Sequence, residues 1–267
     1  MSKVVFITGA SSGIGKTIGE FLFEKGYKVY GSSRNPENYP NSKIKLLPLE
    51  VRNSASIRDS ISKVVTLEGK IDVLINNAGV GITGPLEELP MTEIKNNFDV
   101  NFFGPIDVMQ NVLPFMRKQN SGLIINITSI AGYMGLPFRS VYSASKGALE
   151  LITEGIRMEV KPFNIHLVNV APGDFATDIA SRRFHAPLLE NSAYKKNYGD
   201  TLEMMNQHVD SGSNPLEMAQ AIEMIINTSN PKIHYKVGAF LQKFSIVLKR
   251  ILSDKQYERM LMKHYNL

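Results

Sequence analysis

The chain has 267 residues, of which 43% are hydrophobic and 21% charged, which fits a soluble protein of one large α/β domain as well as one of two small domains. It has no cysteine, which excludes disulfides, thiolate metal sites and cysteine nucleophiles. The net charge of +5 comes from the C-terminal end, where eight basic and two acidic residues follow Pro231. This distribution argues against a nucleic-acid-binding body.

The N-terminal apolar run at residues 4–7 is too short for a signal peptide, and no run approaches the ~20 residues of a membrane span. We therefore expect a cytoplasmic protein. We also expect no metal-binding residues in its site.

Apolar runs alternate with helical patterns along the whole chain. The pattern predicts strands at 4–8, 28–33, 44–49, 71–75, 123–128 and 165–170, with a last edge strand at 234–237. It predicts helices at 13–25, 54–67, 91–118, 140–160 and 215–227, the third kinked at Gly104-Pro105. Because no repeat or linker divides the chain, residues 1–267 are expected to form a single domain with a Rossmann-like, doubly wound parallel sheet.

The loop after the first strand, TGASSGIG at residues 8–15, carries three glycines. Such a loop lets a pyrophosphate approach the N-terminus of the following helix. Residues 10–17, ASSGIGKT, also come close to the P-loop pattern, but Ala10 stands where its first glycine belongs. A P-loop enzyme needs an acidic residue after a later strand, whereas Asp72 precedes the fourth strand. A dinucleotide site is therefore favoured over an NTPase site.

The second predicted strand ends at Ser33-Arg34, where a dinucleotide fold meets the adenosine ribose. An acidic residue there would bind the 2′-hydroxyl, and an arginine accommodates a 2′-phosphate. Arg34 thus favours NADP(H) over NAD(H), unless it is only a solvated loop residue.

Tyr142 and Lys146 lie one turn apart on the same face of a predicted helix. An ammonium beside a phenol favours the phenolate, which suits proton transfer near neutral pH. Ser129, at the end of the fifth strand, could meet the phenol across a substrate carbonyl. Asn101 lies among apolar residues, either as a helix-bend satisfier or as an amide positioned in the site.

Residues 174–213, called the lid segment below, show weak periodicity and are expected to form a substrate lid or binding loop. Residues 239–267, called the tail, predict amphipathic helices, with a capping box from Ser253 to Gln256. We favour packing of the tail on the body or on a partner subunit. The alternative is peripheral contact of this basic tail with a membrane.

Together these segments resemble the short-chain dehydrogenase/reductase family over nearly the whole chain. The matching motifs are Thr8-Gly9-xxx-Gly13-Ile14-Gly15, Asn76-Asn77-Ala78-Gly79, Asn101, Ser129, Tyr142-xxx-Lys146, and Pro172-Gly173 with Thr177. The resemblance implies a Rossmann-like domain that uses NAD(P) for hydride transfer. It also implies a homodimer or homotetramer assembled through the helices at 91–118 and 140–160.

The resemblance further implies roles for single residues. Tyr142 would be the general acid or base, Lys146 would favour its phenolate and hold the nicotinamide ribose, Ser129 would bind the substrate oxygen, and Asn101 would anchor a relay water. The residues expected to contact the cofactor are Gly9, Ser11, Ser12, Gly13, Ile14, Gly15, Arg34, Glu50, Val51, Asn77, Ala78, Gly79, Tyr142, Lys146, Pro172, Gly173, Phe175 and Thr177.

Two positions depart from the family pattern. Asp is common where Glu50 stands, and NADP-using members often have a basic residue where Ser12 lies. The predicted preference for NADP(H) therefore rests on Arg34 alone.

We predict an NADPH-preferring reductase of a ketone or aldehyde, reversible toward alcohol oxidation. Apolar residues of the lid segment (Phe184, Leu188, Leu189, Met204 and Met205) favour a steroid, retinoid or long-chain carbonyl. The alternatives are an NAD-linked dehydrogenase of a polar alcohol and a non-catalytic NADP-binding sensor or scaffold.

Overall fold

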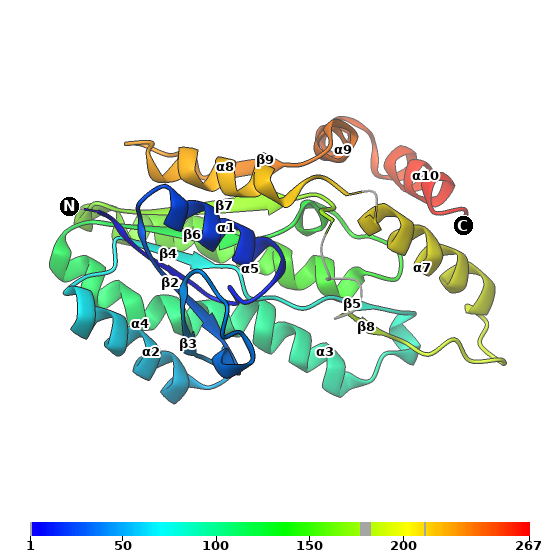
Figure 1. Ribbon diagram of the computed structural model, residues 1–267. Coiled ribbons are helices and arrows are strands. Elements are labelled where there is room, and N and C mark those ends of the chain that lie inside the picture. Colours follow the sequence, from blue (N-terminus) through cyan, green and yellow to red (C-terminus); the bar gives the residue numbers. More distant parts are fainter. Residues whose placement is uncertain (1, 177–182, 211) are drawn as a thin grey trace.

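The structure, a computed structural model, describes residues 2–176, 183–210 and 212–267. Within them the main sheet has seven parallel strands in the order β3-β2-β1-β4-β6-β7-β9 (Figure 1). Their bounds are β1 Val4–Ile7, β2 Lys28–Ser33, β3 Lys45–Pro48, β4 Val73–Asn76, β6 Gly122–Ile127, β7 Ile165–Pro172 and β9 His234–Val237. The predicted doubly wound parallel sheet is confirmed, including its edge strand.

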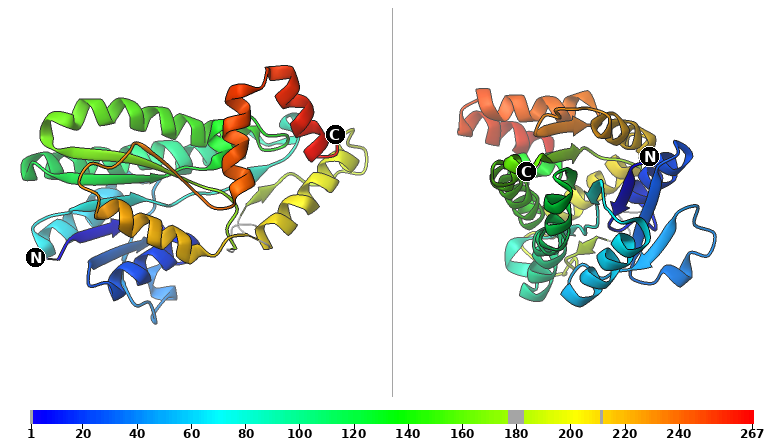
Figure 2. Two further views of the ribbon diagram at one scale, coloured as in Figure 1. Left: turned by 90° about the horizontal axis from the view of Figure 1, so that it is seen from above. Right: turned by 90° about the vertical axis from the view of Figure 1, so that its left-hand side faces the viewer.

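Helices cover both faces of this sheet (Figures 1 and 2). One face carries α1 (Gly13–Glu24) and α8 (Pro215–Ile226), which pack against each other. The other carries α2 (Ser54–Glu68), α4 (Gly104–Gln119) and α5 (Ser140–Val160). The strands read as continuous apolar runs because both faces of a parallel sheet are buried.

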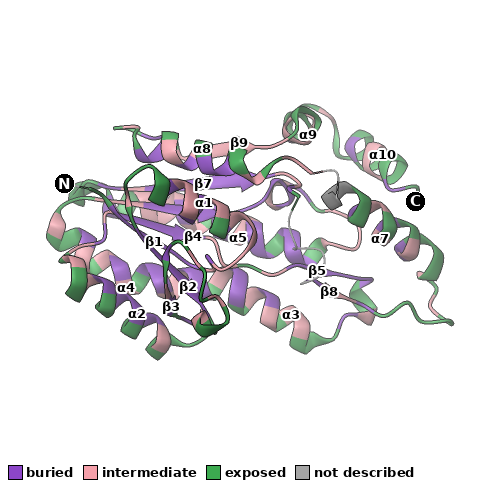
Figure 3. Cartoon of the chain, viewed as in Figure 1, coloured by how far each residue is buried: buried purple, intermediate pink, exposed green. Residues whose placement is uncertain are grey.

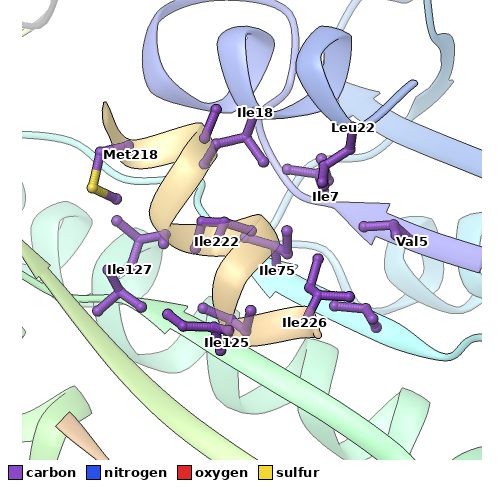
Figure 4. Packing of buried hydrophobic residues seen from close by; sticks show 14 of the residues in the cluster. Val5, Ile7, Ile18, Leu22, Ile75, Ile125, Ile127, Met218, Ile222 and Ile226 are labelled. Atoms are coloured by element: carbon purple, nitrogen blue, oxygen red, sulfur yellow. The ribbon is translucent and has the colours of Figure 1, made fainter. Parts of the chain in front are cut away.

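The core between α8 and the sheet shows how these layers are held together (Figure 4). Ile222 of α8 is fully buried and packs in one cluster with Ile18 and Leu22 of α1 and with Ile75 of β4. Burying each such side chain contributes about 1.5–3 kcal/mol. This packing fixes α1, whose N-terminus faces the carboxyl ends of the strands.

The predicted kinked helix at 91–118 is observed as three consecutive segments. They are α3 (Met91–Phe98), a π-helical segment (Asp99–Phe103) and α4. The irregularity thus precedes Gly104-Pro105 rather than falling on it, because the wider π turn already adjusts the backbone there.

The lid segment is more regular than predicted. It contains β8 (Phe184–His185), paired with β5 (Ile82–Thr83), and α7 (Lys195–Asp210). The weak periodicity did not predict α7, in which Tyr198, Leu202 and Met205 recur at helical spacing. Tyr198 is fully buried in a cluster with Phe138 and Tyr142.

The tail forms α9 (Phe240–Ile251) and α10 (Asp254–His264), joined by the predicted capping box at Ser253 and Gln256. Both lie beyond the carboxyl end of β7 (Figure 2). Ile246 and Tyr257 anchor them in a cluster with Ile130 and Met134. None of the described helices is both long and apolar enough to cross a membrane.

Candidate active site

A cleft of about 780 Å³ opens at the carboxyl ends of β1 and β4, where the strand order reverses. Such a switch point is where open parallel sheets bind their ligands. The predicted cofactor residues that line it are Gly9, Ser11, Ser12, Gly13, Ile14, Gly15, Arg34, Glu50, Val51, Asn77, Ala78, Gly79, Tyr142, Lys146 and Pro172.

The glycine-rich loop is braced from the adjacent strand. Asn77 Nδ2 donates to the carbonyl oxygens of Thr8 (3.0 Å) and Gly9 (2.9 Å), and Thr8 Oγ1 accepts from the amides of Asn77 (3.0 Å) and Ala78 (3.1 Å). A Cβ at Gly15 would lie 2.5 Å from the carbonyl oxygen of Gly9 and 2.3 Å from Asn77 Nδ2, so only glycine fits. Gly9 has a φ of +66°, which also favours glycine. The loop therefore keeps its backbone close to the cleft, as a phosphate cradle requires.

Lys16 lies outside this cradle. It is exposed, and its Nζ lies 3.9 Å from Glu20 Oε1 on the same helix. In a P-loop the lysine reaches the phosphates, so the geometry speaks against the NTPase alternative.

Arg34, Glu50 and Arg52 form the end of the cleft beyond β2 and β3. Burial alone would raise the pKa of Glu50, but hydrogen bonds from Arg52 and the charges of Arg52 and Arg34 hold that pKa below its usual value. Arg52 is paired with Glu50 at 3.0 Å. Among the described residues, no carboxylate lies within 4.0 Å of the Arg34 guanidinium, and Arg34 is exposed. A cation remains available at this end for an anionic ligand.

Tyr142 and Lys146 lie on the opposite wall, presented by the buried side of α5. Lys146 Nζ donates to Ile127 O at 3.0 Å, which fixes the amine beneath the end of β6. Burial lowers the pKa of Lys146 to about 8. The lysine therefore exchanges a proton much nearer neutral pH than an exposed one does.

The turn that follows Ser129 packs on α5, the helix that carries Tyr142 and Lys146, through a close contact between Gly132 and Gly147. Ser129 caps this 3-10 turn, η4 (Ile130–Tyr133), with Oγ accepting from Ala131 N at 3.1 Å. A Cβ at Gly147 would lie 2.9 Å from Gly132 O, so this turn rests directly on the backbone of α5. Ser129 itself is not among the residues lining the cleft.

Asn101 is fully buried in the π-helical segment. Its Oδ1 accepts from Val80 N, and its Nδ2 donates to Val80 O, both at 2.9 Å. Nδ2 also lies 3.2 Å from Ser145 Oγ on α5. The amide thus holds the loop after β4 against the helix that carries Tyr142.

Of the predicted cofactor residues, Gly173 and Phe175 are not among those that line the cleft. The amide of Gly173 donates to Val237 O at 2.8 Å, and Phe175 is buried in the core. Thr177 lies outside the described residues.

Comparison with known proteins decides the family. Residues 3–187 match the family model described as short chain dehydrogenase. A 3-ketodihydrosphingosine reductase of Bacteroides thetaiotaomicron is 39% identical over 96% of this chain and 95% of that protein. An NADPH-dependent 1-acyldihydroxyacetone phosphate reductase of Saccharomyces cerevisiae is 32% identical over 92% and 86%. A crystal structure of a short-chain dehydrogenase from Streptomyces avermitilis, 29% identical, superposes with a TM-score of 0.83 over 100% of this chain and 97% of that one.

The chain belongs to the short-chain dehydrogenase family. As a short-chain dehydrogenase it is an NAD(P)-dependent oxidoreductase that acts on a small-molecule substrate. The cleft suits that cofactor, because its size, its glycine cradle and its basic end match a dinucleotide. In the described part of the chain, no group of three or more His, Asp and Glu side chains is arranged to hold a metal ion.

Two arginines of this short-chain dehydrogenase, Arg139 and Arg183, lie near Tyr142 and were not predicted as site residues. The Arg139 guanidinium lies 5.3 Å from the centre of the Tyr142 ring. Arg183, in the lid segment, is 9% exposed, and burial together with the charge of Arg139 lowers its pKa. Among the described residues, no carboxylate lies within 4.0 Å of it. The Arg182-Arg183 pair was the only signal in the sequence, and it gave no indication that Arg183 is buried.

Proposed function

We propose that this protein reduces a hydrophobic ketone or aldehyde with NADPH. One observation carries the proposal. The glycine cradle, the Arg34 cation and the Tyr142–Lys146 pair all line one continuous cleft. This arrangement suits a dinucleotide bound from its 2′-phosphate at Arg34 to its nicotinamide near Tyr142.

In the proposed mechanism, Tyr142 transfers its phenolic proton to the carbonyl oxygen of the substrate. When bound, the reduced nicotinamide supplies the hydride to the carbonyl carbon, and the C=O double bond becomes the C–OH bond of the product alcohol. Lys146 stabilises the resulting phenolate through its positive charge. Ser129 hydrogen-bonds the substrate oxygen as charge develops.

Asn101 acts as a positioning residue in this proposal. Its side-chain amide is bonded to the main chain of Val80. It therefore supports the site by holding the cleft wall at Gly79, where an added Cβ would lie 3.2 Å from Asn101 Oδ1 and 3.3 Å from Lys146 Nζ.

The cofactor preference is tested by titrating the protein with NADPH and with NADH, following the fluorescence of the reduced nicotinamide. A charge-assisted hydrogen bond to the 2′-phosphate is worth about 1.5–3 kcal/mol, so Arg34→Ala should weaken NADPH binding about 10- to 100-fold and leave NADH binding unchanged. Arg58→Ala, an exposed arginine of α2 outside the cleft, is the matched control. Equal affinity for the two cofactors in the wild type would contradict the preference. Binding of neither would contradict the proposed site.

The substrate is proposed to be a carbonyl compound with an apolar body and a polar or anionic head. Phe138, Tyr198 and Met205 provide apolar surroundings near Tyr142, and Arg183 offers a buried cation there. The two relatives described above are named for a keto sphingoid compound and an acylated phosphate ester, which fits this class. A screen of long-chain, steroid and retinoid carbonyls with and without acidic groups tests it. Turnover of only small polar alcohols with NAD would contradict it.

We also propose that two copies pair through α4 and α5. Leu151 and Met158 of α5 are 69% and 72% exposed and lie seven residues apart on one face. These two exposed apolar side chains on one helix face support an interface between subunits there. Light scattering should give the mass of a dimer or tetramer, and Leu151→Glu should reduce it to that of the monomer.

A further inference from the structure

Helix α9 packs on the protein with its polar side. Gln242 Oε1 accepts from Asp174 N at 3.1 Å, and Gln242 Nε2 donates to Asp174 Oδ2 at 2.6 Å. Ser245 Oγ lies 3.9 Å from Met134 Sδ. Ile246 is the only buried residue of this helix. An amphipathic helix that covers a core presents its apolar side inward. In α9 only Ile246 and the partly buried Leu248 pack inward, and the other apolar side chains are exposed.

The outward face of α9 is apolar. Phe240, Leu241 and Ile251 are 71%, 77% and 73% exposed, and Phe244 and Val247 also reach solvent. Phe240, Phe244, Val247 and Ile251 follow one another at helical spacing on a single stripe. The Phe240 and Phe244 rings stack with their centres 5.8 Å apart. Figure 3 shows how much of α9 is coloured as exposed. This stripe, called the outer face of α9 below, lacks a covering element among the described residues.

Basic side chains border the outer face of α9. Lys243 and Arg250, seven residues apart, lie along one edge of the stripe. The exposed Lys255, Arg259 and Lys263 of α10 add positive charge to the same end of the molecule. An apolar stripe edged by cations suits a surface that is apolar inside and anionic outside. A second copy of this chain suits it less well, because pairing through this stripe would bring like charges together.

We propose that the outer face of α9 binds the surface of a lipid bilayer that contains anionic lipids. The aromatic and aliphatic side chains enter the boundary between headgroups and acyl chains, while Lys243 and Arg250 contact headgroup phosphates or carboxylates. Gln242 links this helix to Asp174, the first residue of the lid segment. The bilayer therefore lies beside the segment that borders Tyr142, where an apolar substrate would leave the membrane.

The test is flotation of the full-length protein with vesicles of phosphatidylcholine alone and of phosphatidylcholine with phosphatidylserine. We expect binding to the anionic vesicles at low ionic strength and weaker binding in high salt. Phe240→Ser with Leu241→Ser should lower the partition coefficient about tenfold or more. Lys243→Gln with Arg250→Gln should have an effect of about tenfold on anionic vesicles only.

Matched controls come from α2. Leu67 is 51% exposed there, and Arg58 and Lys63 are exposed. Leu67→Ser, and Arg58→Gln with Lys63→Gln, should leave flotation unchanged. Circular dichroism and the unfolding midpoint establish that each variant is folded. NADPH titration of the same variants reports on the proposed function separately, since vesicle binding uses neither cofactor nor substrate.

Three results would overturn the proposal. The first is a wild-type protein that does not float with anionic vesicles. The second is that the α2 variants weaken flotation as much as the α9 variants do. The third is a Phe240→Ser/Leu241→Ser variant that keeps full binding. If this variant instead lowers the molar mass in solution while the wild type does not float, the outer face of α9 joins two copies of the chain.

Discussion

Asn101 and Val80 exchange two hydrogen bonds, with Oδ1 accepting from Val80 N and Nδ2 donating to Val80 O, both at 2.9 Å. Replacing Asn101 by Ala would leave Val80 N without this acceptor, at a cost of about 1–3 kcal/mol if the group stays dry, whereas Val80 O keeps a second donor, Asn97 Nδ2, at 3.0 Å. We expect a lower unfolding free energy in urea and weaker NADPH binding. Asn111→Ala, on the outer part of α4, serves as the control. Unchanged stability and affinity would show that Asn101 does not hold this loop.

Tyr142→Phe keeps the buried ring and removes only the phenolic hydroxyl. The reduction rate should fall about 10²- to 10⁴-fold, because general acid catalysis is lost, while the NADPH dissociation constant stays within about twofold. Steady-state kinetics and cofactor fluorescence measure the two quantities. Tyr27→Phe removes a hydroxyl that bonds Asn227, far from the cleft, and should leave both unchanged. A Tyr142→Phe enzyme with full activity would refute the assigned proton donor, and a cofactor-binding sensor would then be favoured.

The buried ammonium of Lys146 serves the proposed reaction but lowers the free energy of unfolding. Its pKa falls on folding from 10.5 to about 8, so the folded state disfavours the ammonium. The cost is present in full below about pH 8 and is relieved as the pH rises from 8 toward 10.5. Lys146→Met should therefore raise the unfolding free energy at neutral pH by about 1–3 kcal/mol and abolish most turnover. In the wild type, kcat/KM should fall as the pH rises through about 8. A less stable Lys146→Met protein would show that the bond to Ile127 O outweighs the desolvation.

Glu150 is a second buried ionisable group, one turn of α5 beyond Lys146. Its Oε1 accepts from Thr128 Oγ1 at 2.8 Å, and burial raises its pKa to about 7. Because the folded state holds this proton more tightly than the unfolded state does, its contribution to stability declines as the pH rises from about 4.5 through 7 and then levels off. Glu150→Gln should remove this decline and stabilise the protein by about 1–3 kcal/mol above pH 7. Urea unfolding across this pH range measures it, and Glu159→Gln, an exposed carboxylate on the same helix, should keep the wild-type slope.

The sheet and most of the cleft followed from local sequence signals. Buried parallel strands such as β6 are short apolar runs, and the loops at their carboxyl ends converge by topology alone. The glycines at positions 9 and 15 leave room for Ala78 and Asn77, which pack so closely that a Cβ at either position would clash. The strands follow from residues close together in sequence, and the contacts of the two glycines follow from the order of the strands, since β1 pairs with β4.

Other features depend on contacts between distant residues. The apolar periodicity of α9 predicted an amphipathic helix, but its orientation is set by Gln242 meeting Asp174, 68 residues away. The tail packs on the body through Ile246 of α9 and Tyr257 of α10, whereas Phe240, Leu241 and Ile251 of α9 face outward. Arg183 is buried only because α7 and the loop at Gly81 enclose it. No local pattern encodes such an enclosure.

The two ends of the lid segment are joined to each other. Ser213 N donates to Asp174 O at 3.0 Å, and Ala176 N donates to Ser213 O at 3.1 Å. The chain thus leaves the end of β7 and enters α8 at one place, so the intervening stretch is a cassette whose two ends are held together. Because the proposed substrate contacts at Tyr198 and Arg183 lie within that cassette, we expect its exchange between relatives to alter which molecules are accepted while the sheet and its cradle keep their geometry. New specificities on this scaffold could therefore arise by recombination at a single pair of junctions.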